Sequence, residues 1–123
     1  MRRSIIPKET MFNLFSRKSD GVDISPEEFK EMLDNDRGVV IDVRTRGEYE
    51  EGHLTITDEQ KDVMNGDFSR ALESLDKEKT FYLYCRSGNR SGQAARMMRN
   101  QGFEKSYNVG GFDQLVRAGF DSE

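Results

Sequence analysis

The sequence predicts an α/β domain in which a central parallel sheet of four to five strands carries helices on both faces. Residues 39–43 and 80–84 are almost unbroken runs of β-branched, aliphatic and aromatic residues, which are typical of strands covered on both faces. Segments with helical patterns and capping signals alternate with the strands along the chain. Strands that alternate with helices in this way pair in parallel.

The first predicted elements are a short edge strand at residues 21–24 and the helix that follows it. Ser25 is suited to the N-cap position and Pro26 to the first helical position. Glu28, in the third helical position, completes a capping box. We expect this helix to end near residues 35–36.

The strand at residues 39–43 contains one acidic residue, Asp42. A buried carboxylate needs hydrogen-bond partners, and Arg44 and the nearby loop amides are the candidates. Thr45 is suited to cap a short helix that Gly52 ends.

The segment after this short helix is the hardest part of the chain to interpret. Residues 54–57 alternate apolar and polar side chains and predict a strand. Asp67 or Ser69 would then cap a helix that extends to Leu75. The only histidine, His53, could act as a general base, but no second histidine accompanies it. We favour a structural role for it and expect neither a metal site nor a cofactor.

The second half of the chain is predicted to repeat the strand–helix alternation. A helix at residues 91–100 follows the strand at residues 80–84, and a strand at residues 106–109 and a helix at residues 112–118 complete the domain. Ligands of parallel α/β sheets bind beyond the carboxyl ends of the strands. The loop after residue 84 is therefore the first candidate for a functional site.

That loop holds the only cysteine of the chain. Residues 85–91 read Cys-Arg-Ser-Gly-Asn-Arg-Ser, between the end of a predicted strand and the start of a predicted helix. Loop amides and the helix dipole attract an anion at such a position. The two arginines of the loop, one and five residues after the cysteine, add positive charge.

A thiol in this setting is predicted to ionise easily. An ordinary thiol is only slightly ionised at neutral pH, whereas each hydrogen bond to an anion contributes about 1.5–3 kcal/mol. Two or three loop N–H donors would therefore suffice without a histidine base. We expect Cys85 to be an exposed nucleophile. The alternative is a buried, inert cysteine at the end of a strand.

The composition limits the class of protein. The chain has 123 residues, so we expect one domain at residues 21–123 after a flexible tail at residues 1–20. Residues 11–15 form a small apolar patch that could anchor to a membrane or a partner, but a loosely ordered tail is favoured. A single cysteine excludes an internal disulfide, and a net charge of -4 argues against general nucleic-acid binding. No apolar run approaches the ~18 residues of a membrane span. We expect a cytoplasmic monomer.

These motifs together resemble a single-domain rhodanese from about Ile24 to Phe120. The motifs that carry the resemblance are Asp42-Val43-Arg44, Glu48-Tyr49, Glu51-Gly52-His53, the segment from Tyr84 to Ser91, Gly102-Phe103, and the segment from Tyr107 to Gly111. The resemblance implies a three-layer rhodanese-like fold and sulfurtransferase activity. In that family the loop cysteine takes sulfane sulfur from a donor such as thiosulfate, forms a persulfide, and passes the sulfur to cyanide or a protein thiol. The segment after His53 is more polar than the family pattern.

The resemblance also implies roles for individual residues. Cys85 would carry the persulfide, Arg86 would help to recruit the anionic donor, and Arg90 would close the loop and add positive potential. Asp42 and Arg44 would support the site through hydrogen bonds. The remaining loop residues whose amides would line the cradle are Ser87, Gly88, Asn89 and Ser91.

Three other functions remain open. The domain could relay sulfur between a protein donor and a protein acceptor, with thiosulfate as a surrogate. It could be a non-catalytic interaction module, although inactive relatives usually lack the cysteine. It could also be a cysteine-dependent phosphatase or arsenate reductase of the same superfamily. Those enzymes typically have a loop one residue longer, whereas four residues separate Cys85 from Arg90 here.

Overall fold

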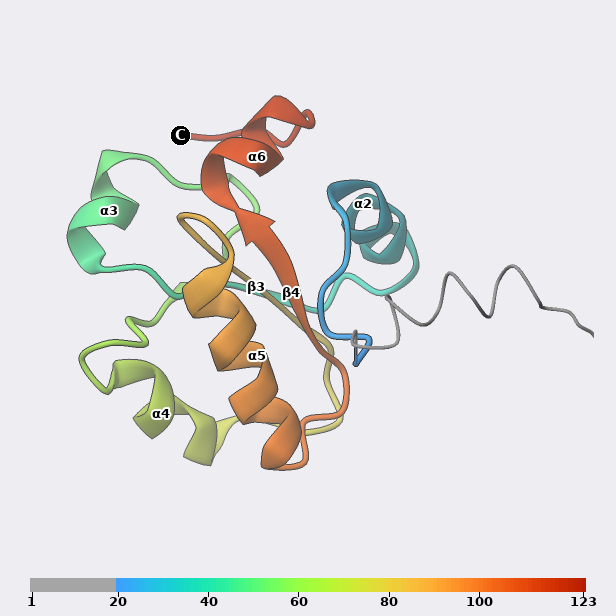
Figure 1. Ribbon diagram of the computed structural model, residues 1–123, viewed down its shortest axis with the longest axis vertical. Helices are drawn as coiled ribbons and strands as arrows, with labels where there is room; N and C mark the ends of the chain where they lie inside the picture. Colours follow the sequence, from blue (N-terminus) through green and yellow to red (C-terminus); the bar gives the residue numbers. More distant parts are fainter. Residues whose placement is uncertain (1–19) are drawn as a thin grey trace, which may run out of the picture.

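The computed structural model describes residues 20–123. A four-stranded parallel sheet has the order β2-β1-β3-β4 and carries helices on both faces (Figure 1). The predicted α/β class and parallel sheet are confirmed. The predicted tail lies outside the described residues except for Asp20. The strands are β1 (Val39–Asp42), β2 (Glu59–Gln60), β3 (Phe81–Cys85) and β4 (Ser106–Gly111).

The helices within residues 20–123 differ in length, and α5 is the longest of them. None of the helices within residues 20–123 is long and apolar enough to cross a membrane. The helices are α2 (Pro26–Asn35), α3 (Arg46–Glu51), α4 (Asp67–Ala71), α5 (Asn89–Asn100) and α6 (Phe112–Arg117), and a 3₁₀ turn, η1 (Leu72–Ser74), follows α4.

The start of α2 has the predicted capping box. The Glu28 amide donates to the Ser25 hydroxyl at 3.1 Å, and the Ser25 amide donates to the Glu28 carboxylate at 2.9 Å. Pro26 occupies the first helical position, where its missing N–H costs no hydrogen bond. Phe29 is the buried residue of this helix and anchors it to the sheet.

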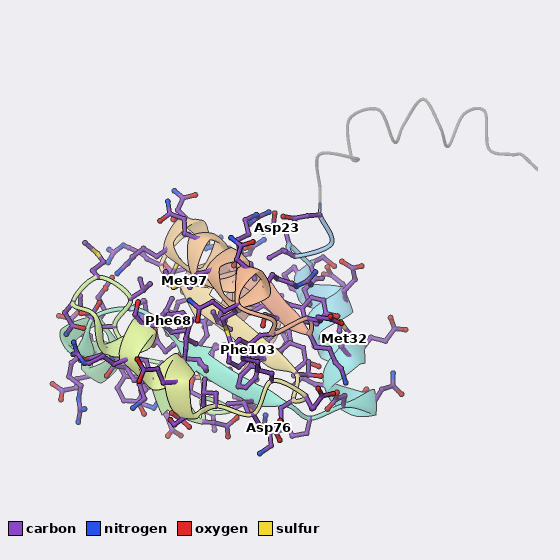
Figure 2. All side chains as sticks on the ribbon, turned by 90° about the horizontal axis from the view of Figure 1, so that it is seen from below. Asp23, Met32, Phe68, Asp76, Met97 and Phe103 are labelled. Carbon is purple, nitrogen blue, oxygen red and sulfur yellow. The ribbon has the colours of Figure 1, made fainter. Side chains whose placement is uncertain are left out.

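Strand β3 separates two hydrophobic cores because its side chains alternate between the two faces of the sheet. Phe81, Leu83 and Cys85 belong to the core that includes residues of α4 and α5. Tyr82 and Tyr84 belong to the core that includes residues of α2 and α6. Figure 2 shows side chains of the two sides: Phe68, Met97 and Phe103 on one, and Met32 on the other.

The predicted strand at residues 54–57 is wrong. Leu54 forms an isolated antiparallel bridge with Ser122, and the Thr57 amide then donates to the Leu54 carbonyl at 3.0 Å in a turn. The strand at this edge of the sheet is instead β2, whose two residues pair with β1. Polar residues can form β2 because an edge strand bonds a neighbour on one side only.

The predicted edge strand at residues 21–24 is reduced to one parallel bridge between Asp23 and Asn108. The Asn108 amide donates to the Val22 carbonyl at 2.8 Å, and the Ile24 amide donates to the Asn108 carbonyl at 3.0 Å. The pairing stops there because the chain turns into α2. The segment therefore lies beside β4.

The predicted cap of the helix after residue 66 is also wrong. The N-cap of α4 is Gly66, in a left-handed conformation with φ 93°, and it makes no side-chain capping bond. Asp67 is the first helical residue, and Ser69 lies inside the helix. An acidic side chain in the first turn still interacts favourably with the helix dipole, which explains why the pattern suggested a cap.

Candidate active site

The cysteine lies at the carboxyl end of β3, where the chain turns into α5. Gly88 is the N-cap of α5 and adopts a left-handed conformation with φ 99°. This backbone is strained for any residue with a side chain. The helix was predicted to begin at Ser91. It begins two residues earlier, at Asn89, because the chain turns sharply at Gly88.

Three hydrogen-bond donors surround the sulfur of Cys85. The Gly88 amide lies 3.0 Å from Sγ and the Ser91 amide 3.4 Å, while the Ser91 hydroxyl lies 3.3 Å away. Burial raises the pKa of the Cys85 thiol, but these hydrogen bonds outweigh burial and hold the pKa below its ordinary value. The Gly88 and Ser91 amides therefore point at the sulfur, whereas the Asn89 amide donates to the Ser87 hydroxyl.

The prediction that the thiol is exposed is wrong for this conformation. Cys85 has 0% relative accessibility and belongs to the core that includes α4 and α5. Its side chain points to the same face of the sheet as Leu83, because alternate residues of a strand share a face. A substrate can reach the sulfur only after the loop or its neighbours move.

Replacing Ser91 by alanine is expected to raise the pKa of the Cys85 thiol. The variant removes the hydroxyl donor but keeps the backbone amide, so the thiolate loses one of the groups that favour it. Ultraviolet absorbance of the thiolate during a pH titration measures this pKa without a reagent that must reach the buried sulfur. Ser87→Ala is the matched control, because the Ser87 hydroxyl accepts only a long 3.4 Å bond from the Asn89 amide. Identical titrations of Ser91→Ala and wild type would contradict this role of the hydroxyl.

Asn108 of β4 holds both the hydroxyl and the loop in place. The single hydrogen of the Ser91 hydroxyl can be donated either to the Cys85 sulfur or to Asn108 Oδ1, which lies 2.7 Å from the hydroxyl oxygen. Asn108 Nδ2 donates to the Gly88 carbonyl at 3.0 Å. The same nitrogen donates to Asp23 at 2.8 Å, which fixes the orientation of the amide. Sequence patterns alone did not place Asn108 at the site. The available signal was a polar side chain within a predicted strand of the sheet.

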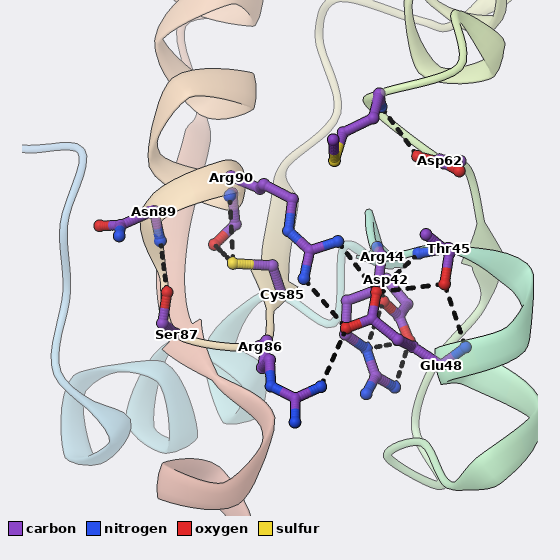
Figure 3. A network of polar contacts seen from close by, with 12 residues as sticks. Asp42, Arg44, Thr45, Glu48, Asp62, Cys85, Arg86, Ser87, Asn89 and Arg90 are labelled. Atoms are coloured by element: carbon purple, nitrogen blue, oxygen red, sulfur yellow. Dashed lines mark hydrogen bonds and ion pairs between the residues drawn. The ribbon is translucent and has the colours of Figure 1, made fainter.

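The two loop arginines meet one carboxylate, that of Glu48 on α3 (Figure 3). Arg90 donates two hydrogen bonds to it, at 2.9 and 3.0 Å, and Arg86 donates a third at 3.3 Å. The Arg90 hydrogen bonds lower the pKa of Glu48 to about 2, so this carboxylate is ionised at neutral pH. The positive charge expected from the two arginines is therefore partly cancelled.

Glu48 lies at the site, although the sequence predicted no role for it there beyond its place in a family motif. It is the third residue of α3, where its carboxylate accepts a hydrogen bond from the Thr45 amide at 3.1 Å. The Thr45 hydroxyl accepts in return from the Glu48 amide at 3.1 Å, which completes a second capping box. The capping box is visible in the sequence, but the arginine partners lie about 40 residues further along the chain.

Asp42 and Arg44 form a buried ion pair at the carboxyl end of β1. Arg44 Nε and Nη2 donate to the Asp42 carboxylate at 2.9 and 2.7 Å, and the Arg44 amide donates to it at 2.9 Å. Arg44 also donates to the Gly52 carbonyl at 2.7 Å, and its guanidinium lies 4.7 Å from the ring centre of Phe112. The predicted partners of Asp42 are confirmed. The pair joins the end of β1 to the end of α3, which carries Glu48.

The other predicted residues lie at the margin of the site. Ser87 and Asn89 are exposed, and with Gly88 they line a separate cavity of about 590 Å³ on the β4 side. His53 Nδ1 lies 3.0 Å from the Tyr49 carbonyl, and its ring stacks on Tyr49 at 3.9 Å, which agrees with a structural role. Among residues 20–123, no group of three or more His, Cys, Asp or Glu side chains could hold a metal ion.

The fold and this loop define a class of protein: a parallel α/β domain with one cysteine in an amide-lined loop at a helix N-terminus. A family model described as the rhodanese-like domain matches residues 25–118. The chain therefore belongs to the rhodanese-like domain family. The predicted family is confirmed.

Relatives with different names share this domain. A putative sulfur carrier protein, YrkF of Bacillus subtilis, is 36% identical over 71% of this chain and 46% of its own length. The thiosulfate sulfurtransferase GlpE of Actinobacillus pleuropneumoniae is 29% identical over 82% of this chain and 92% of its own length. A rhodanese-like domain protein from Staphylococcus aureus has a crystal structure with TM-score 0.65 and 25% identity, over 81% of this chain and 96% of that one. The chain spans less than half the length of the first curated relatives that it matches.

Proposed function

We propose that this protein is a sulfurtransferase that carries sulfane sulfur as a persulfide on Cys85. The observation that carries the proposal is the convergence of the Gly88 amide and the Ser91 amide and hydroxyl on one sulfur atom. Donors that stabilise a thiolate can also stabilise the negative charge of a persulfide. The family, and a relative named as a thiosulfate sulfurtransferase, support the same chemistry.

The proposed reaction has two balanced steps. The Cys85 thiolate attacks the outer sulfur of thiosulfate, the sulfur–sulfur bond of thiosulfate breaks, and sulfite leaves with the electron pair. A thiophilic acceptor, cyanide or a protein thiolate, then attacks the terminal sulfur of the persulfide. The bond to Cys85 breaks, and the thiolate is restored for the next cycle. Neither step needs a metal, an oxidant or a cofactor.

The proposed roles of the other residues follow from their positions. Arg86 is exposed and would meet the anionic donor first, whereas Arg90 is tied to Glu48 and would hold the loop closed. The buried pair of Asp42 and Arg44 would hold the end of α3, and with it Glu48, in position. Because Cys85 is enclosed, the proposal requires the loop to open during each cycle.

Intact mass spectrometry tests this function. After incubation with thiosulfate, the protein should gain the mass of one sulfur atom per chain, and cyanide should then remove that mass and yield thiocyanate. A chain that stays unmodified and yields no thiocyanate would contradict the proposal. Hydrolysis of a phosphate ester that depends on Cys85 would instead favour the phosphatase alternative.

A sulfur relay between proteins is the second candidate. It uses the same persulfide, and the similarity to a putative sulfur carrier protein favours it. Transfer of sulfur from the loaded protein to candidate carrier proteins, compared with transfer to cyanide, separates the two roles. A non-catalytic interaction module would show neither transfer.

A further inference from the structure

The loop arginines carry less free positive charge than their number suggests. Glu48 accepts two hydrogen bonds from Arg90 and one from Arg86, so two guanidinium groups and one carboxylate share one net positive charge. The side chains of Arg90 and Glu48 are only 23% and 18% exposed, whereas that of Arg86 is 76% exposed. We call these three side chains the Glu48 cluster.

The position of the Glu48 cluster makes its net charge important for a small anion. Arg90 and the Cys85 sulfur lie close enough for their charges to interact, and the thiolate raises the pKa of Arg90 together with Glu48. Glu48 and Arg86 also line a pocket of about 190 Å³, whose other charged side chains are Arg44, Glu51 and Asp113. Partly buried charges are screened less than exposed ones. The Coulomb energy of attraction to each added positive charge is about twice as large for a dianion as for a monoanion.

We propose that Glu48 is a specificity-determining residue: it lowers the net charge at the loop and so favours monoanionic sulfur donors over dianionic thiosulfate. The donors favoured would be of the thiosulfonate or persulfide class, whose reacting end carries one negative charge. This inference rests on the proposed sulfur transfer and identifies the class of donor for the same site.

Methanethiosulfonate and thiosulfate form a matched pair of donors for the test. Both have a terminal sulfur bonded to an oxidised sulfur, but methanethiosulfonate has a methyl group where thiosulfate has a charged oxygen. The Cys85 thiolate attacks the terminal sulfur of either donor, and the sulfur–sulfur bond breaks with its electron pair on the leaving group. That group is methanesulfinate in one case and sulfite in the other. The ratio of kcat/KM values, thiosulfate over methanethiosulfonate, therefore reports discrimination by charge.

The decisive variant is Glu48→Gln. Glutamine is accepted at this position of a capping box, so the start of α3 should be retained while one negative charge is removed. We expect the thiosulfate to methanethiosulfonate ratio to rise about tenfold. The rise should shrink at high salt, because salt screens the added charge. A ratio that stays at the wild-type value while both rates fall would overturn the proposal, since Glu48 would then only hold the loop.

Glu50→Gln is the matched control. Glu50 lies on the same helix and pairs with Arg46 at 3.1 Å on the exposed side. The substitution changes the net charge of the protein by the same amount, away from the Glu48 cluster. The donor ratio of this variant should equal that of wild type. A tenfold rise in it as well would show that total charge, and not Glu48, sets the ratio.

If Glu48→Gln does not fold, Arg86→Gln tests the same effect of charge on the donor ratio. It lowers the net charge of the Glu48 cluster at an exposed position, so the donor ratio should fall, and an unchanged ratio would also overturn the proposal. The wild-type protein separates this inference from the proposed function. Transfer from neither donor would refute the sulfurtransferase, whereas transfer from both with a ratio that no variant changes refutes only the role of Glu48.

Discussion

Replacement of Cys85 by serine is expected to lower kcat/KM for sulfur transfer at least about a thousandfold. A serine hydroxyl is scarcely ionised at neutral pH and cannot hold a sulfane sulfur, although it would accept the same hydrogen bonds from Gly88 and Ser91. The rate of thiocyanate formation from thiosulfate and cyanide measures the effect. Intact mass after incubation with thiosulfate shows whether the variant still gains a sulfur atom.

Two observations make this result interpretable. The Cys85→Ser side chain is close in size to the original, so the free energy of unfolding should stay within about 1 kcal/mol of the wild-type value. Ser87→Ala, a change at an exposed position of the same loop, should keep most of the activity. Sulfur transfer by Cys85→Ser at the wild-type rate would remove Cys85 from the reaction and with it the proposed mechanism.

Replacement of Arg44 by alanine is expected to destabilise the domain by about 3–5 kcal/mol, because it leaves a buried carboxylate without its partner. The Asp42 side chain has no exposed surface and that of Arg44 is 5% exposed, so water cannot replace the lost guanidinium without local opening. The variant also loses the hydrogen bond to the Gly52 carbonyl. Domains of this size have a total stability of about 5–15 kcal/mol. Urea unfolding followed by circular dichroism measures the change.

Arg46→Ala is the matched control for this prediction. It is the same substitution two residues later, but Arg46 and Glu50 form an exposed pair with 74% and 61% of the side chains accessible. Exposed ion pairs contribute about 0–1 kcal/mol, so this variant should be nearly as stable as wild type. Equal losses in Arg44→Ala and Arg46→Ala would mean that burial of the Asp42–Arg44 pair does not determine its contribution.

Local interactions explain why much of the fold could be predicted. The capping boxes at Ser25 and Thr45 join residues three apart, so their spacing is visible in the chain itself. The pair of Asp42 and Arg44 is similarly local, two residues apart at the end of a buried strand. The strand, loop and helix around Cys85 also follow from short-range patterns, because aromatic and aliphatic residues end where a glycine-containing loop begins.

Two of the errors arose where contacts distant in sequence decide the structure. The alternating pattern at residues 54–57 suggested a strand, but Leu54 pairs with Ser122 near the end of the chain. The exposure of Cys85 was predicted from the chemistry of the loop. It depends instead on the face of β3 from which the side chain projects and on the core packed there.

By itself the sequence determined the parallel α/β class and the position of the cysteine in a loop between a strand and a helix, because each depends on periodicity or on neighbours along the chain. Only the tertiary structure decided that Glu48 meets Arg86 and Arg90, and that Asn108 orients Ser91. Those contacts require α3 and β4 to lie near the start of α5. The charges of Glu48 and the two arginines therefore offset one another only in the folded chain. The hydrogen bond between Ser91 and Asn108 likewise forms only after folding.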